Sequence, residues 1–422
     1  MASVKVNPNP NISTSNNIET NFQTELVALR AAQMAPYFTI GAKAFLGDQL
    51  IGKRNGQTYG FVIRDAGEAV NSLDASSDTK TDVVERRVDL SIEPWHIFVK
   101  TNAVEGKTDL QFDKEVAEPN GLKLINGALK KSIKSDLAKC ATCFVGEKGQ
   151  FEPLSMASGH LSSVTAEPLY GFVDPMVEAI VTSKGAQFVP VNAPDMYKQG
   201  LIGHFHGADY RSQRFLPQLK VSKTLADALV GATFASFNDT TNTLTITLGT
   251  AAAAATKVQA GMPFFIDGIV ACDLVGDETA QPYAFIAAED VTVSNGAETI
   301  AIKVDPVDVA LGGTRVAAME DGSAVVWSGD DKTVTTSTAV SAPAQGTYFM
   351  GLIRANGTYE FETLNEIDVA TVDTKKGSVE GINIFQNRLV DLVKMVNDTR
   401  FDLFTISGTV EKRGVSLILI KA

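Results

Sequence analysis

Cysteine is scarce in this chain, and its scarcity limits the chemistry that the sequence supports. Three cysteines occur in 422 residues, an odd and small number that excludes a disulfide framework. Cys140 and Cys143 form a C-x-x-C pair, but a zinc site needs further ligands, and Cys272 alone does not supply them. A redox couple of this spacing opens a helix, whereas this pair follows a helical pattern. We therefore expect buried, inert thiols.

Basic charge and long apolar runs are also missing. The chain has 37 Lys and Arg against 49 Asp and Glu, a net charge of −12, which argues against a general nucleic-acid binder. No stretch reaches the roughly 18–20 apolar residues of a membrane-spanning helix. Residues 1–17 show no signal-peptide core. Since 44% of the residues are hydrophobic and 20% charged, we expect a folded chain without membrane contact.

Catalytic signatures are absent as well. No G-x-S-x-G, Walker A, G-x-G-x-x-G or H-E-x-x-H pattern occurs. Among the four histidines, His204 and His206 share one face of an expected strand, and a metal site with Asp209 as third ligand is the alternative to ordinary polar packing. His96 lies between apolar residues and is expected to be an ordinary strand residue. We predict no enzyme, and no catalytic, cofactor-binding or metal residues.

Hydrophobic patterns divide the chain into parts and predict an α+β fold. Residues up to about 24 are polar and predict an arm, and a short helical pattern covers 25–35. Two strands at 57–64 and 83–92 predict a long hairpin, with Val88, Leu90 and Ile92 on one face. Its tip is polar and long, so it is expected to be disordered or docked on another molecule.

The strongest helical pattern follows the hairpin. Pro119 and Asn120 open it, and apolar residues recur at helical spacing. The opposite face is basic, with Asp136 as its one acid, and a solvated face is favoured over a specific anion site. The apolar residues are Leu122, Ile125, Leu129, Ile133, Leu137 and Phe144, and the basic residues are Lys123, Lys130, Lys131, Lys134 and Lys139.

The remaining segments alternate between mixed and purely β patterns. Asp174 and Pro175 predict the start of a helix. From 221 to 335 the helical periodicity gives way to alternating strands, which suggests an inserted small β-barrel with a core of its own. Within it, a hairpin turn is expected at Asn295 and Gly296, and the alanine run 251–255 is expected to be a linker or one helical turn. A second hairpin is expected to turn at Asn356 and Gly357.

This order of parts resembles that of the major capsid proteins of tailed bacteriophages. Residues 109–139 look like the spine helix and its lead-in, and 185–203 resemble the strand-then-helix unit of the axial domain, with Pro194, Asp195 and Tyr197 in matching places. The β-rich block is similar in placement to the inserted domain of certain short-tailed phages. Gly261 and Met262 depart from that pattern, which often has Gly-Asp.

The resemblance implies a role in assembly without chemistry. It implies an arm and short helix at 1–35, an extended loop and the start of a peripheral β-arm at 36–104, and the spine helix at 105–150. The axial domain would occupy 151–220, the insertion 221–335, and the remaining axial and peripheral strands 336–422. The extended loop would contact a neighbouring subunit through Arg64, Asp65, Glu68, Asp82, Glu85, Arg86 and Arg87.

The implied partners are copies of the chain itself, in hexamers and pentamers of a capsid lattice. Scaffolding and portal proteins are the further partners, and the shell would enclose DNA without sequence-specific binding. Assembly would take place in the cytoplasm of the host bacterium, and the protein would end in the virion. Three alternatives stay open: a bacterial nanocompartment shell of the same fold, another phage structural protein such as a tail component, and a metal-binding enzyme using His204 and His206.

Overall fold

The computed structural model has a mixed α+β fold, which confirms the predicted class, and it divides into two compact units. Unit 1 comprises 1–59, 89–132 and 360–408, and unit 2 comprises 60–88, 133–359 and 409–422. No helix of the described residues is long and apolar enough to cross a membrane. The structure describes residues 13–33, 35–43, 58–64, 85–100, 109–147, 150, 152–179, 201–205, 207–238, 241–274, 278–305, 315–318, 325–328, 332–334, 336–364, 374–391 and 396–422.

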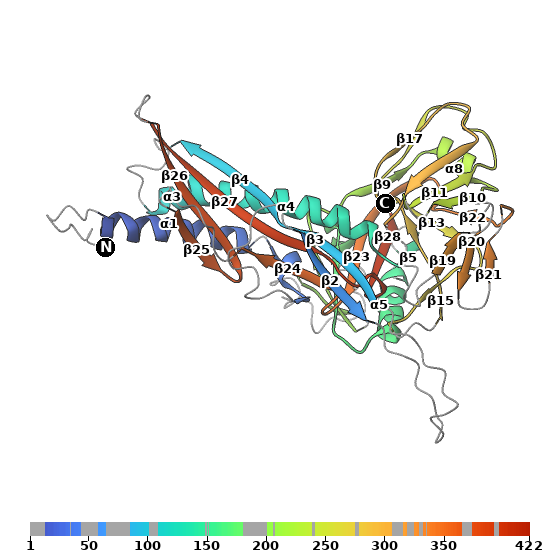
Figure 1. Ribbon diagram of the computed structural model, residues 1–422, viewed down its shortest axis with the longest axis horizontal. Helices are drawn as coiled ribbons and strands as arrows, with labels where there is room; N and C mark the ends of the chain where they lie inside the picture. The colour runs from blue at the N-terminus through green and yellow to red at the C-terminus, as the bar shows by residue number, and fades with distance from the viewer. Residues whose placement is uncertain are drawn as a thin grey trace, which may run out of the picture. The chain divides into compact units, whose positions relative to one another are not determined.

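Unit 1 is built on a six-stranded sheet with the order β1-β24-β27-β26-β25, in which β4 pairs with β27. Figure 1 shows β4, β27 and β26 running side by side as long antiparallel strands. One face of this sheet carries apolar residues such as Phe401, which is fully buried. The strands are β1 Ala42–Lys43, β4 Glu93–Lys100, β24 Tyr359–Thr363, β25 Thr374–Val379, β26 Ile382–Asp391 and β27 Val396–Thr409.

Helices cover that face of the sheet. The arm helix begins at Ser13, so the expected helix start at 25 is wrong and residues 13–24 of the expected arm are helical. The spine helix also begins earlier than Pro119, because a helical lead-in precedes it from Asp109. The helices are α1 Ser13–Gln33, α2 Pro36–Thr39, α3 Asp109–Phe112, the π-helix η3 Asp113–Ala117 and α4 Glu118–Ala138.

Small residues let α1 and α4 approach closely. A Cβ added to Gly121 of α4 would lie 2.7 Å from the carbonyl oxygen of Val27 and 3.1 Å from the backbone nitrogen of Ala31. Backbone atoms cannot move aside as a flexible side chain can, so only glycine fits at this position. The contact therefore fixes where α1 docks on α4.

Replacing Gly121 with valine is expected to lower the free energy of unfolding by about 2 kcal/mol, because overpacking forces α1 away from α4. The matched control is Gly159→Ala in α5 (Glu152–Val164), where an added Cβ meets nothing within 4 Å. That control is expected to stabilise the protein by about 0.5–1 kcal/mol, since alanine favours a helix over glycine. Chemical denaturation of both variants measures the difference, and equal stabilities would contradict the packing account.

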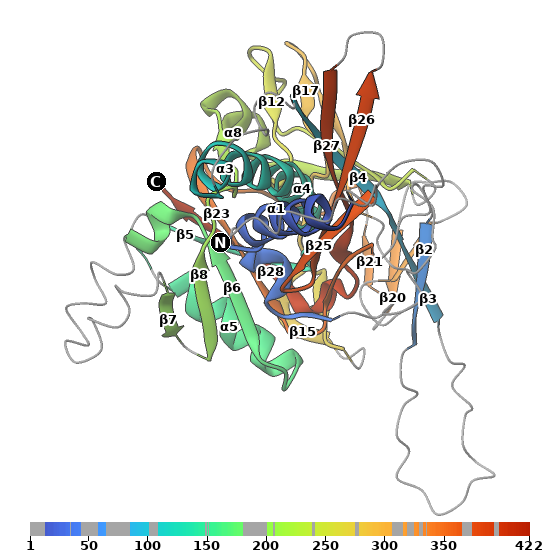
Figure 2. The same cartoon turned by 90° about the vertical axis from the view of Figure 1, so that its left-hand side faces the viewer.

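Unit 2 contains a seven-stranded sheet with the order β5-β28-β23-β6-β8-β7, in which β9 also pairs with β23. In Figure 2, α5 lies beside this sheet, and its Leu154, Ala157 and Leu161 share a core with β6 and β28. The strands are β5 Thr142–Gly146, β6 Leu169–Val173, β7 Leu201–Phe205, β8 Ala208–Ser212, β9 Gln218–Val221, β23 Gly346–Ala355 and β28 Val415–Lys421.

Strand β28 is central in this sheet. It pairs antiparallel with β23 and parallel with β5, so both of its edges are paired. Val415, Leu417 and Leu419 are buried, as are the residues between them, so both of its faces are covered as well. Phe144 lies in β5 and not in the spine helix, so its placement by helical spacing is wrong. The predicted cap is confirmed, because Asp174 Oδ1 accepts a hydrogen bond from the Met176 backbone at 2.8 Å.

The β-rich block after residue 221 forms several small sheets. The alternation is confirmed, since Leu244 and Ile246 of β11 are fully buried and pair with Ile302 and Ile300 of β18. The described strands form the ladders β10-β11-β18, β12-β17, β16-β13-β22, β14-β15 and β19-β20-β21. Single bridges join Thr233 of β10 to Ala339 and Ala287 to Val304, so the two ladders β10-β11-β18 and β16-β13-β22 are linked at both ends, and a closed barrel stays a prediction. The block extends past 335, because β22 pairs with β13.

Several local expectations for this block change. A short helix, α8 (Lys223–Leu229), opens it with a cap from Ser222, although the sequence predicts no helix there. The alanine run is an irregular linker. The remaining strands are β10 Thr233–Asn238, β11 Thr243–Thr247, β12 Thr256–Val258, β13 Pro263–Ile266, β14 Val270–Cys272, β15 Glu278–Pro282, β16 Phe285–Ile286, β17 Val291–Val293, β18 Thr299–Lys303, β19 Arg315–Ala318, β20 Val325–Ser328, β21 Lys332–Val334 and β22 Val340–Ser341.

Two expected hairpins are turns between strands that do not pair. Gly296 has φ +77° and Gly357 has φ +78°, the left-handed conformation that glycine adopts most easily, so both turns form. However, β17 pairs with β12 and β18 with β11, and the turn at Gly357 joins β23 to β24, which belong to different sheets. Turn residues therefore predict where the chain reverses direction, but they do not predict which strand each neighbouring strand pairs with.

Candidate functional site

The predicted hairpin forms a separate two-stranded ribbon. Strands β2 (Thr58–Arg64) and β3 (Glu85–Ser91) pair with each other and with no further strand among the described residues. The side-chain oxygens of Thr58 and Ser91 lie 3.3 Å apart at its base. Of the residues predicted to contact a neighbouring subunit, Arg64, Glu85, Arg86 and Arg87 lie in these strands, and Asp65, Glu68 and Asp82 lie outside the described residues.

The base of the ribbon runs into unit 1. Leu90 and Ile92 are buried, and Val88 is half-buried, in agreement with the predicted apolar face. Only Ile92 separates the end of β3 from the start of β4, so the ribbon and the sheet of unit 1 are joined without a loop.

The spine helix α4 has the predicted inner and outer faces. Ile125, Leu129, Ile133 and Leu137 are buried, whereas Leu122 is half-buried. Leu124, which the spacing does not single out, is buried instead. The outer face carries exposed Lys123, Lys130, Lys131 and Lys134 and half-buried Lys139, which agrees with a solvated basic face.

Contacts along α4 fix the helix on the sheet of unit 1. The Trp95 ring of β4 fills the space beside Gly127, where an added Cβ would lie 2.8 Å from ring atoms. Lys131 of α4 and Glu93 of β4 form an ion pair with a 2.6 Å separation between Nζ and Oε1. The spine helix and the edge of the sheet therefore behave as one scaffold.

An ion pair ties the arm helix to the lead-in of the spine helix. Arg30 of α1 donates from Nε to Asp113 Oδ1 at 2.9 Å and from Nη2 to Oδ2, a two-bond arrangement that suits guanidinium and carboxylate geometry. Hydrogen bonding from Arg30 lowers the pKa of Asp113. The carboxylate form is therefore favoured in the folded protein.

This ion pair predicts a pH dependence with a definite sign. Because folding depresses the pKa of Asp113, its contribution to stability is complete above the unfolded value of about 3.9 and is lost as the pH falls through the folded value. Wild type is therefore expected to lose more stability than Asp113→Asn between pH 6 and pH 2.5. Urea midpoints across this range test the prediction, and parallel curves for the two proteins would contradict it.

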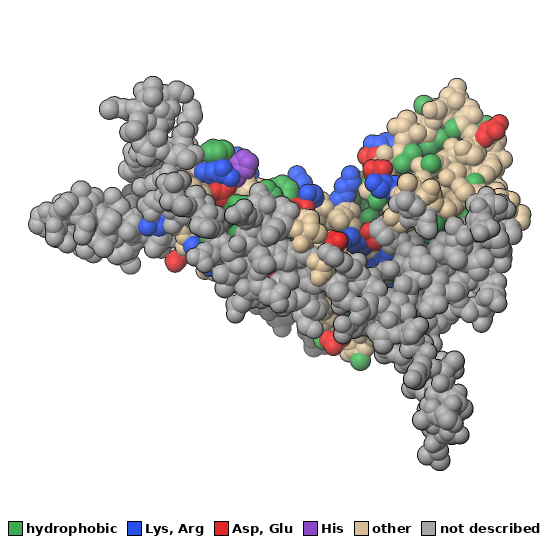
Figure 3. All heavy atoms as spheres, in the orientation of Figure 1, with side chains coloured by type: hydrophobic (Ala, Val, Ile, Leu, Met, Phe, Trp, Pro, Cys, Tyr) green, Lys and Arg blue, Asp and Glu red, His purple; other side chains and the backbone are tan. Residues whose placement is uncertain are grey.

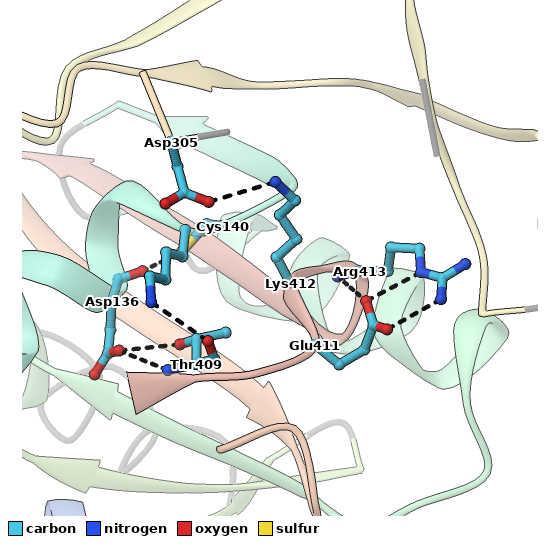
Figure 4. Close-up of polar contacts among 8 residues, drawn as sticks. Asp136, Cys140, Asp305, Thr409, Glu411, Lys412 and Arg413 are labelled. Atoms are coloured by element: carbon cyan, nitrogen blue, oxygen red, sulfur yellow. Dashed lines mark hydrogen bonds and ion pairs between the residues drawn. The ribbon is translucent and has the colours of Figure 1, made fainter. Parts of the chain in front are cut away.

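A polar cluster within unit 2 joins the end of α4 to the segment between β27 and β28. We call it the β27–β28 joint, and it consists of Asp136, Lys139, Asp305, Thr409, Glu411, Lys412 and Arg413. Figure 4 shows Asp136 facing Thr409, and Asp136 Oδ1 accepts hydrogen bonds from the Thr409 backbone nitrogen and Oγ1, each at 3.0 Å. Asp136 is fully buried, so these bonds stabilise a carboxylate shielded from water.

The other half of the joint reaches the β-rich block. Lys412 Nζ lies 3.4 Å from Asp305 Oδ2, and Arg413 donates from Nη1 to the Asp273 carbonyl oxygen at 3.3 Å. Glu411 holds the Arg413 guanidinium through two oxygens, each at 3.0 Å (Figure 4). The charged groups of the joint are paired within it, so the arrangement fastens the end of α4, the β27–β28 segment and the β-rich block together.

The described thiols and histidines are not grouped as metal ligands. Burial raises the pKa of both Cys140 and Cys143 well above the usual range, which agrees with inert thiols, although Cys143 is only half-buried. His204 of β7 stands opposite Asp209 of β8, and His206 lies outside the described residues. Within the part of the chain that the structure describes, no three His, Cys, Asp or Glu residues are grouped for a metal ion.

One open cavity of about 400 Å³ lies between α5 and β15. It includes His160, where burial lowers the pKa and favours the neutral imidazole. The nearby Ser158 hydroxyl is bonded to the Leu154 carbonyl at 3.1 Å, so it is not aligned as a nucleophile with this histidine.

The comparisons with known proteins give a likeness of overall structure. No family model matches the chain, and no curated protein matches its sequence. Among solved structures, the head of Helicobacter pylori bacteriophage KHP40 is 7% identical, with TM-score 0.43 and coverage of 92% of this chain and 91% of that one. The acid-stable capsid of Helicobacter pylori bacteriophage KHP30 is 6% identical, with TM-score 0.42 and coverage of 92% and 89%. A structure from Mycobacterium phage Che8 is 10% identical, with TM-score 0.41 and coverage of 90% of both chains.

Proposed function

We propose that this chain is the major capsid protein of a tailed bacteriophage and assembles with copies of itself into an icosahedral shell around double-stranded DNA. The observation that carries the proposal is the β2–β3 ribbon, a sheet of two strands by itself among the described residues. A two-stranded hairpin is at best marginally stable in water. A ribbon of this kind is expected to be stabilised by contact with a second molecule. In a shell, a neighbouring subunit provides that contact.

The scaffold behind the ribbon supports the same proposal. The ribbon continues through Ile92 into β4, and β4 is fixed to the spine helix through Trp95 and Gly127. A force on the ribbon is therefore transmitted to packed structure and not to a loose loop. The described residues show polar clusters that fasten segments together, such as the β27–β28 joint, which suits a structural role.

The proposal also assigns parts and partners. The extended loop and the start of the peripheral β-arm would be 36–104, the spine helix 105–150 and the axial domain 151–220. The inserted domain would begin at 221 and extend to the end of β22 at Ser341, with axial and peripheral strands in the rest of the chain. Copies would meet as hexamers and pentamers, with scaffolding and portal proteins as further partners. Each copy would engage several neighbours at once, so contacts that are individually modest give a lasting shell. The net charge of −12 would keep the shell from gripping the enclosed DNA.

Shortening the ribbon tests this proposal. Replacing 65–82 with a short Gly-Ser turn is expected to abolish fast-sedimenting particles, while the subunit keeps its melting temperature, because the replaced segment is outside both described strands. The matched control replaces 306–314 in the β-rich block and is expected to leave particles intact. Sedimentation of lysates made with scaffolding candidates gives the readout. Particles of normal yield from the ribbon variant would contradict the proposal.

A further inference from the structure

Two of the edge strands of the unit 1 sheet, β25 and β4, differ in how they are protected. Exposed edge strands present unpaired N–H and C=O groups, and proteins guard them with lysine, proline or a covering element. Strand β25 is guarded: it carries Lys375 and Lys376, and α1 lies against Gly377, where an added Cβ would be 2.5 Å from the Thr24 backbone. Among the described residues β4 pairs with β27 alone, which leaves its other edge open.

The sequence of β4 leaves most of this edge unguarded. Pro94 protects the N-terminal end, since it has no N–H to donate. The following residues, 95–99, read Trp-His-Ile-Phe-Val, which combines high β-propensity with no formal charge when the histidine is neutral. A strand of this kind would promote uncontrolled pairing in a protein that left it bare. Its chemistry therefore indicates a designated partner.

The outward face of β4 carries an exposed aromatic side chain. Trp95 points toward α4, so Phe98, an odd number of residues away, lies on the opposite face and is 55% exposed. The His96 ring lies 5.5 Å from the Phe98 ring in an edge-to-face geometry. Figure 3 shows hydrophobic, basic and histidine side chains gathered on the surface over β4 and β27.

A cation is fixed over this aromatic ring. The Arg400 guanidinium lies 5.5 Å from the Phe98 ring centre, and its Nε donates to Asp402 at 2.6 Å. Asp402 is held in turn by Asn387, also at 2.6 Å. Aromatic and arginine side chains contribute much of the binding energy of protein interfaces. Side chains that are already held in place lose less conformational entropy when a partner binds. We call Phe98, His96, Arg400 and the open backbone edge at 95–99 the β4 patch.

We propose that a second copy of this chain docks on the β4 patch, adding an extended segment along 95–99 and covering Phe98. This inference rests on the proposed function. The ribbon proposed to reach a neighbouring copy continues directly into β4, so the patch adjoins that contact.

Photocrosslinking from position 98 identifies the occupant. The full chain is made with p-benzoylphenylalanine at 98, mixed as ¹⁵N-labelled and unlabelled copies, assembled with scaffolding candidates and irradiated. Mass spectrometry is expected to find hybrid crosslinks between labelled and unlabelled chains. In parallel, Phe98→Asp is expected to cut particle yield at least about tenfold, as loss of an interface hot spot does. The control Val230→Asp, at a residue 72% exposed in the β-rich block, is expected to assemble normally.

The outcomes separate this inference from the proposed function. Both aspartate variants are expected to melt like wild type, since the replaced side chains are mostly exposed. Normal particles from Phe98→Asp, or crosslinks only to a scaffolding protein or within one chain, would overturn the docking of a second copy while leaving the capsid function intact. If wild type forms no particles, the capsid function fails. Hybrid crosslinks between concentrated soluble copies would then still support the β4 patch, and their absence would refute it.

Discussion

Replacing Arg354 with alanine is expected to lower the free energy of unfolding by about 4 kcal/mol, the largest effect of a single substitution that we predict. Arg354 of β23 is only 1% exposed. Its guanidinium carbon lies 3.9 Å from the Tyr359 ring centre and 4.9 Å from that of Phe172. Desolvated contacts between a cation and an aromatic face contribute about 2 kcal/mol each, and the deleted side chain also leaves a cavity.

Two further variants separate charge from volume at this position. Arg354→Lys keeps the charge but loses the planar group that stacks between the rings, so an intermediate loss is expected. Arg354→Met keeps the stem and removes the cation, and it reports the electrostatic part. Urea unfolding with linear extrapolation measures all three. A loss below about 1 kcal/mol for Arg354→Ala would show that the two ring contacts do not stabilise unit 2.

Asp136→Ala is expected to cost about 3 kcal/mol, the second-largest effect. The substitution removes two charge-assisted hydrogen bonds and leaves the Thr409 backbone N–H, which is buried, without the acceptor that it uses in the joint. Asp136→Asn retains an acceptor oxygen in nearly the same place, so a much smaller loss is expected. Thr409→Val removes only the hydroxyl donor.

A double-mutant cycle tests whether these groups act together. Asp136→Ala and Thr409→Val are each measured alone and combined, and a coupling of about 1 kcal/mol is expected because the two side chains share a bond. Chemical denaturation measures the free energy of unfolding of each variant. Hydrogen exchange of the β28 amides provides a second, local measurement. Additive losses would mean that Asp136 stabilises the protein without its hydrogen bond from the Thr409 hydroxyl, for example through the bond from the Thr409 backbone N–H.

The periodicity of apolar residues predicts the buried faces of single helices and strands. The inner face of α4 follows from the spacing of Ile125, Leu129, Ile133 and Leu137, and the alternation at Leu244 and Ile246 predicts a strand with one buried face. The early start of α1 could not be predicted, because residues 13–24 are mostly Ser, Thr and Asn, which favour caps and turns over helix interiors. Packing outweighs propensity at the end of that stretch, as the close contact between Gly377 of β25 and the Thr24 backbone indicates.

Strand pairing and polar contacts between distant residues could not be predicted, because local sequence patterns do not specify which distant segments meet. The partner of β18 is β11, more than 50 residues earlier, and no local signal specifies that choice. Asp136 and Thr409 are separated by 273 positions. In the sequence Asp136 was an exception on a basic helix face, and that mismatch was the one available sign of a buried role. The Phe98 and Arg400 pair gave no comparable sign, since exposure is a property of the folded sheet.

The most direct test of the central claim is negative-stain electron microscopy of the full chain, expressed alone and with candidate scaffolding proteins. The proposed function predicts closed shells, tubes or broken spirals built from this chain. A uniform population of monomers or dimers, at high concentration and with those partners present, would contradict it.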